Sequence, residues 1–118
     1  MKYLFILNDP PYGTERSYNA LRHARELLKE GSPGVEVKVF LIGDAASGAK
    51  TGQKVPQGYY SVEAMLHGIS ARGADIGVCG TCMDARGIGE TELARGCVRS
   101  TMTQLADWSN WADKVLVY

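Results

Sequence analysis

The chain has 118 residues, of which 45% are hydrophobic and 22% are charged. This length is close to the common size of one domain, so we expect a single domain over residues 1–118. Thirteen lysines and arginines balance thirteen aspartates and glutamates, and neither sign forms a long run. A protein that grips a phosphate backbone needs an excess of positive charge, so nucleic acid is not an expected partner.

The first apolar run, residues 3–7, is too short for the core of a signal peptide, and Asn8 and Asp9 end it. No later stretch approaches the roughly 20 apolar residues that cross a bilayer. We therefore expect a protein that avoids membranes and stays in the cytoplasm. In that reducing compartment its three cysteines start as thiols.

The period of the hydrophobic residues changes along the first half of the chain. Residues 3–7 have the continuous apolar character of a buried strand. Apolar positions at helical spacing then predict a helix that Thr14 caps and Gly31 ends. Residues 35–42 predict a second strand. The segment 43–60, with four glycines, predicts a long connecting loop.

The second half continues the alternation. Ser61 is the expected cap of a helix that Gly73 ends, and residues 74–79 predict a third strand. The remaining elements are expected in this order: a helical segment over 81–94 that two glycines interrupt, a short strand at 97–99, a helix introduced by the Thr101–Gln104 capping box, and a last strand at 114–118.

This order predicts an α/β protein with three layers, α/β/α, around a five-stranded, mainly parallel sheet. A flavodoxin-like wind is the simplest arrangement, and it makes strands one and three neighbours. Such sheets bind ligands beyond the carboxyl ends of their strands, where the strand order reverses. We therefore expect residues 8–13 beside Cys79, with Asn8, Asp9 and Tyr12 lining the opposite wall of the site.

A Cys-Gly-Thr-Cys motif falls where the third strand ends and a helix begins. Backbone amides at such a position favour a thiolate at Cys79, and the thiolate is the nucleophile of sulfur and disulfide chemistry. Cys82, three residues on, can resolve a mixed disulfide or accept a sulfur atom. Thr81 and Arg86 are expected to support the thiolate, whereas Asp84 opposes the positive charge of Arg86.

Other kinds of site have little support. The motif supplies two metal ligands where structural zinc needs four, and His23 and His67 lack metal spacing, so neither a metal nor a cofactor is predicted. The glycine-rich segments match neither nucleotide-binding pattern. No catalytic triad or pair of carboxylates stands out, which argues against a hydrolase. Cys97, between a glycine and a valine in a predicted strand, is expected in the core.

Four segments together resemble the DsrE/DsrF-like family: the opening strand with its Asn-Asp-Pro, residues 52–66, the cysteine segment CGTCMDARGI at 79–88, and residues 105–118. The likeness covers nearly the whole chain, and the cysteine segment is its most specific part. The family includes sulfur-relay proteins of the DsrE and TusD type and the YchN-like proteins. The second cysteine makes this chain look closest to the YchN-like branch.

The resemblance implies flavodoxin-like subunits that assemble into trimers or hexamers, and a cysteine that carries persulfide sulfur between donor and acceptor proteins. By its place after the third strand, Cys79 matches that carrier cysteine, whereas Cys82 does not have a counterpart in every branch. We therefore expect an intracellular sulfur-relay protein, a homo-oligomer acting as a sulfur carrier or sulfurtransferase. Two alternatives stay open: a thiol–disulfide switch, and a small-molecule binding or assembly module with incidental cysteines.

Overall fold

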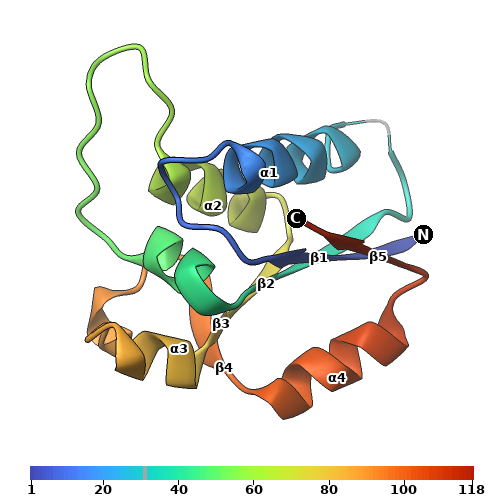
Figure 1. Ribbon diagram of the computed structural model, residues 1–118. Coiled ribbons are helices and arrows are strands. Elements are labelled where there is room, and N and C mark those ends of the chain that lie inside the picture. The colour runs from blue at the N-terminus through green and yellow to red at the C-terminus, as the bar shows by residue number, and fades with distance from the viewer. Residues whose placement is uncertain (31) are drawn as a thin grey trace.

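The computed structural model describes residues 1–30 and 32–118, and strands alternate with helices along them (Figure 1). The strands are β1 (Lys2–Leu7), β2 (Glu36–Leu41), β3 (Asp75–Cys79), β4 (Cys97–Ser100) and β5 (Lys114–Val117). The helices are α1 (Arg16–Leu27), α2 (Val62–Ala71), α3 (Gly80–Ala85) and α4 (Met102–Trp111), with the 3-10 helices η1 (Gly43–Ala49) and η2 (Glu90–Glu92). In the described ranges no helix has the length and apolar character needed to span a bilayer.

The five strands form one parallel sheet in the order β4-β3-β2-β1-β5. Helices α1 and α2 lie on one face of the sheet, and α3 and α4 lie on the other side (Figure 1). Parallel strands need crossover connections, and the helices supply them. The predicted three-layer α/β/α fold with a five-stranded parallel sheet is therefore confirmed.

The neighbours of β1 differ from the prediction. Strand β2 pairs with both β1 and β3, so strands one and three are not adjacent. The chain adds β2, β3 and β4 in turn on one side of β1 and then returns to place β5 on the other side. Residues 8–13 therefore leave the sheet two strands away from Cys79. Local periodicity identifies strands, but long-range packing decides which of them pair, and this is where the prediction was wrong.

Two apolar clusters hold the layers together, one on each face of the sheet. The larger lies between the sheet and α1, α2 and η1, because alternate residues of each strand point to that face. The smaller contains the fully buried Leu4 and Phe40, on which Leu105 and Trp108 of α4 pack. No residue of α4 is itself buried, and Val117 on β5 is 67% exposed. The α4 face is thus the less completely covered one.

The caps of α2 and α4 are those that the sequence predicts. The hydroxyl of Ser61 accepts a hydrogen bond from the N–H of Ala64, and that of Thr101 accepts one from the N–H of Gln104, both at 3.2 Å. These bonds satisfy N–H groups that the first turn of a helix leaves free. The Gln104 side chain does not complete a capping box; its Oε1 accepts a hydrogen bond from Ser100 at 2.7 Å instead.

Helix α1 begins later than predicted. Glu15 is its N-cap residue, and the Thr14 hydroxyl donates a hydrogen bond to the Asp9 carboxylate at 3.0 Å. This bond joins the loop after β1 to the start of the helix. The helix ends at Leu27, and the predicted stop at Gly31 lies outside the described residues.

Two segments near the cysteine motif differ from the prediction. The segment 43–60 is not one loop, because its first part forms η1, whose alanines pack in the main core. Only the part from 50 to 60 extends away from the sheet (Figure 1). The segment 81–94 is not one helix, because α3 ends at Ala85 and a turn leads to η2. Gly87, with φ of 66°, adopts a conformation in that turn which other residues rarely tolerate.

Candidate functional site

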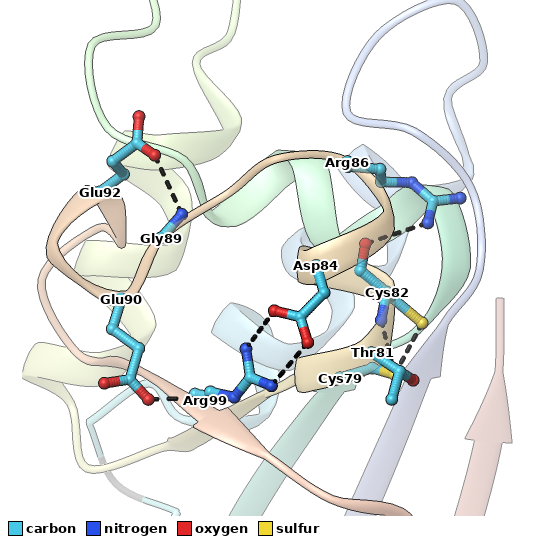
Figure 2. A network of polar contacts seen from close by, with 9 residues as sticks. All are labelled: Cys79, Thr81, Cys82, Asp84, Arg86, Gly89, Glu90, Glu92 and Arg99. Carbon is cyan, nitrogen blue, oxygen red and sulfur yellow. Dashed lines mark hydrogen bonds and ion pairs between the residues drawn. The ribbon is translucent and has the colours of Figure 1, made fainter.

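Cys79 ends β3 and is the N-cap residue of α3, so the strand delivers its sulfur to the carboxyl edge of the sheet. The Cys79 Sγ accepts hydrogen bonds from the backbone N–H of Cys82 at 3.4 Å and from the Cys82 thiol at 2.6 Å. It also lies 3.3 Å from the Thr81 hydroxyl oxygen (Figure 2). Hydrogen bonds to a sulfur favour its ionised form.

The two thiols of the motif have opposite pKa shifts. Burial acts to raise the pKa of Cys79, which is 7% exposed, but the hydrogen bonds from Cys82 and Thr81 outweigh burial and place this pKa below its ordinary value. Burial raises the pKa of Cys82, and the hydrogen bond that its thiol donates to Cys79 raises it further. Cys79 is therefore the more readily ionised sulfur, and Cys82 keeps its proton.

A second segment of the chain holds Cys82. The backbone N–H of Gly43, at the start of η1, donates to the Cys82 Sγ at 3.1 Å. Arg86 donates to the Cys82 carbonyl at 3.1 Å and pairs with Asp44 at 2.6 Å. These contacts link η1 to α3. Sequence reasoning missed Gly43 and Asp44, because nothing local in the sequence signals contacts across some 40 residues.

Asp84 is paired with an arginine that the sequence did not single out. Arg99 on β4 donates two hydrogen bonds to the Asp84 carboxylate, at 2.7 and 3.0 Å, and its Nε lies 3.9 Å from Glu90 (Figure 2). The hydrogen bond from Arg99 holds the pKa of Asp84 below its ordinary value. The negative charge expected to oppose Arg86 is thus compensated from the neighbouring strand.

The three predicted wall residues make contacts elsewhere. Asn8 donates from its backbone N–H and its Nδ2 to the last residue of the chain, next to β5. Asp9 bonds to the start of α1, and Tyr12 donates to Gln53 of the extended loop at 2.6 Å. Among the described residues no hydrogen bond or ion pair joins any of the three to the cysteine motif. Their place in the wall of a site stays a prediction.

The third cysteine has different surroundings. Cys97 begins β4 and is 8% exposed, and burial, with the nearby charge of Glu63, raises the pKa of Cys97 to about 12. A thiol of this kind is inert and behaves as a small apolar side chain. In the part of the chain that the structure describes, no three His, Cys, Asp or Glu side chains converge to hold a metal ion.

Sequence comparison finds relatives of the whole chain. Residues 1–118 match the DsrE/DsrF-like family. Protein YchN of Escherichia coli is 36% identical over 117 residues, which cover 99% of this chain and 98% of that protein. Uncharacterized proteins of Methanocaldococcus jannaschii and Methanopyrus kandleri are also 36% identical, and the matches cover 100% and 96% of this chain and 100% and 90% of theirs.

Comparison with solved structures also finds YchN. The crystal structure of YchN from E. coli superposes with a TM-score of 0.92 at 36% identity, covering 99% of this chain and 98% of that one. A protein of unknown function from Methanobacterium thermoautotrophicum reaches a TM-score of 0.77 over 99% of this chain and 98% of its own, but at 12% identity it shows the fold alone. These matches confirm the resemblance that the cysteine segment indicated. The chain belongs to the DsrE/DsrF-like family.

Proposed function

We propose that the protein is a sulfur carrier in which Cys79 holds sulfur as a persulfide. Membership of the DsrE/DsrF-like family suggests a role of the sulfur-relay type. The observation that carries the choice of residue is the convergence of hydrogen bonds from Cys82 and Thr81 on the Cys79 sulfur. A sulfur that ionises readily is the nucleophile that sulfur transfer needs.

The transfer step requires no cofactor. The Cys79 thiolate attacks the outer sulfur of a donor persulfide, R–S–SH, and a new S–S bond forms at Cys79 while the S–S bond of the donor breaks. The donor leaves as the thiolate R–S⁻, and the proton stays on the transferred sulfur. Delivery is the reverse exchange, in which an acceptor thiolate takes the outer sulfur and Cys79 leaves as a thiolate. Neither exchange needs an oxidant or a reductant, because one S–S bond breaks for each S–S bond that forms.

Cys82 assists this exchange. Its thiol donates a hydrogen bond to the Cys79 sulfur at 2.6 Å, so it stabilises the negative charge that forms there when sulfur is delivered. If a partner protein forms a mixed disulfide with Cys79, the Cys82 thiol loses its proton to water and attacks the Cys79 sulfur; a Cys79–Cys82 disulfide forms, the S–S bond to the partner breaks, and the partner leaves as a thiolate. The Gly43 N–H stabilises the Cys82 sulfur in its ionised form.

We also propose that the chain acts in the cytoplasm as a homo-oligomer, a trimer or a hexamer, together with donor and acceptor proteins, as the family resemblance implies. Exposed apolar side chains on and near the incompletely covered face support self-association: Met102 on α4, and Val115 and Val117 on β5. Native mass spectrometry would count the subunits. A monomer at micromolar concentration would rule out a stable assembly.

Intact-protein mass spectrometry after incubation with a small persulfide donor tests the carrier role. Wild type should gain one or more sulfur atoms, and Cys79→Ser should gain none. Cys97→Ser is the matched control, since it removes a buried thiol, and it should load as wild type does. Loading that persists in Cys79→Ser, or that is absent from folded wild type with a donor proven active, would reject Cys79 as the carrier.

The 2.6 Å contact between the two sulfurs also favours a second function, a thiol–disulfide switch. Here oxidised glutathione takes two electrons from the pair, a Cys79–Cys82 bond forms, and two molecules of reduced glutathione leave. Titration in glutathione buffers measures the reduction potential of the pair. A bridge that forms within the range of the cytosolic poise, in protein that never loads sulfur, would favour the switch over the carrier.

A further inference from the structure

Gly80 follows Cys79 directly, and its missing side chain needs an explanation. It is the first residue of α3, a position that alanine could take without loss of helix propensity. The backbone does not require it, because Gly80 is not among the glycines with positive φ. A Cβ atom at this position would lie 2.8 Å from the Cζ and Nε atoms of Arg99 and 2.9 Å from its Nη2. The Arg99 guanidinium occupies the space that a side chain would fill.

Two strands and two carboxylates keep the guanidinium there. In the β3–β4 register Arg99 pairs with Val78, one residue before Cys79. The side chain then passes over Gly80 to reach Asp84, to which it makes two hydrogen bonds, and its Nε faces Glu90 at 3.9 Å (Figure 2). A planar group held by a bidentate pair has little freedom to leave. The positive charge is therefore fixed against the residue that follows the reactive sulfur.

The charges of Arg99 and Cys79 are coupled. The hydrogen bond with Asp84 is the main cause that raises the pKa of Arg99, and the negative charges of Asp84, Glu90 and the ionised Cys79 add to it. Coupling between two sites is reciprocal, so this attraction favours the ionised form of Cys79 in addition to the hydrogen bonds from Cys82 and Thr81, which are the main causes that lower its pKa. The charged and titratable groups around the motif are Cys82 and Asp84 from α3, Arg86 directly after it, Asp44 from η1, Glu90 from η2 and Arg99 from β4.

We propose that Arg99 is a positioning residue that stabilises the negative charge on Cys79, and that position 80 is glycine so that the guanidinium can lie against the backbone there. The inference deepens the sulfur-carrier proposal, on which its biological purpose rests. Both the thiolate before loading and the persulfide anion after loading carry the charge that Arg99 stabilises. The effect on the thiolate can be measured without any sulfur donor.

The test is the rate of Cys79 alkylation by iodoacetamide as a function of pH, followed on the full-length protein by mass spectrometry of the Cys79 peptide. Arg99→Gln should slow alkylation near neutral pH by about three- to fivefold, because fewer molecules carry the thiolate. At alkaline pH, where the thiol is fully ionised, the rate should equal that of wild type. A change in packing alone would not depend on pH in this way.

Three further variants sharpen the test. Arg99→Lys keeps the charge and should retain most of the rate. Arg95→Gln, a matched control, removes an exposed arginine that takes part in no ion pair among the described residues and should leave the profile unchanged. Gly80→Ala should displace the guanidinium and shift the profile as Arg99→Gln does, with far-UV circular dichroism to check that the fold is kept.

The proposal is overturned if Arg99→Gln has the wild-type profile, if Arg99→Lys loses as much rate as Arg99→Gln, or if Gly80→Ala leaves the profile unchanged. Because this assay contains no persulfide, its result is separate from the loading experiment. A shifted profile in a protein that never loads sulfur would uphold the role of Arg99 and reject the carrier function. An unshifted profile in a protein that loads at Cys79 would reject the role of Arg99 and uphold the carrier function.

Discussion

Cys79 and Cys97 lie at opposite ends of the same pair of strands, where Ile76 pairs with Cys97 and Cys79 pairs with Ser100. Both expose less than a tenth of their surface, 7% and 8%, but Cys97 lies deeper in the protein, so burial acts more strongly on its pKa. Burial raises the pKa of Cys97 to about 12, whereas at Cys79 hydrogen bonds outweigh burial and lower the pKa. The sulfur at the carboxyl edge meets the free N–H groups where a helix starts. The difference teaches that the depth of a sulfur and the hydrogen-bond donors around it together decide its reactivity.

The largest expected effect is the ratio of the two alkylation rates in the native protein. The Cys97 pKa of about 12 lies three units above the ordinary value of 9.0, and that of Cys79 lies below it. Each unit changes the thiolate fraction tenfold, so Cys79 should react at least about 1,000 times faster at neutral pH. Peptide mass spectrometry measures both rates in one sample. Similar alkylation rates for Cys79 and Cys97 would contradict the difference between their pKa values.

Serine should be tolerated differently at the two sites. At Cys97 a hydroxyl would enter the larger apolar cluster, where among the described residues the thiol makes no hydrogen bond, and the free energy of unfolding should fall by about 2 kcal/mol. At Cys79 a hydroxyl can keep the bonds from Thr81 and from the Cys82 N–H, so the loss should be below about 1 kcal/mol. Urea unfolding measures both values, with Cys97→Ala as the control that adds no polar group. A larger loss of unfolding free energy for Cys79→Ser than for Cys97→Ser would contradict this prediction.

The two cysteines should also affect stability at different pH. The folded pKa of Cys97 is raised, so its contribution is complete below about pH 9 and is lost as the pH rises toward 12. The folded pKa of Cys79 is lowered, so its contribution is complete above about pH 9 and is lost as the pH falls through the folded value. Between about pH 9 and pH 10 wild type should therefore lose about 1 kcal/mol more than Cys97→Ala. Equal losses in urea unfolding would contradict burial as the cause.

Local patterns were sufficient to predict much of the fold. The apolar runs identified all five strands, and Ser61 and Thr101 identified the starts of two helices, because each of these signals lies within a few residues. The strand order was wrong at β1, since pairing of β2 with both neighbours depends on contacts between distant segments. The small residues of 43–49 gave no helical period, although their size allows η1 to pack in the core.

The site residues fall into the same two groups, those that a local pattern predicts and those that only contacts between distant segments bring in. The cysteine motif and Arg86 lie within two turns of chain, so their spacing could place them together. Gly43 and Arg99 reach the site only through tertiary structure, from the start of η1 and from β4. The one local signal for Arg99 was Gly80 itself, a glycine at the start of a helix with no turn to justify it. Without the position of the guanidinium, that signal has no interpretation.

The smallest expected effect tests the hydrogen bond from the side chain of Thr81. Thr81→Val removes the hydroxyl, which lies 3.3 Å from the Cys79 sulfur, and keeps the shape of the side chain. Because the bonds from Cys82 remain, Cys79 alkylation near neutral pH should slow by only about twofold. The Cys97 rate should not change, since no hydrogen bond connects Thr81 to β4 among the described residues. A loss as large as that in Arg99→Gln would mean that one exposed hydroxyl, and not the shared set of donors and the nearby charge, separates the two ends of the strands.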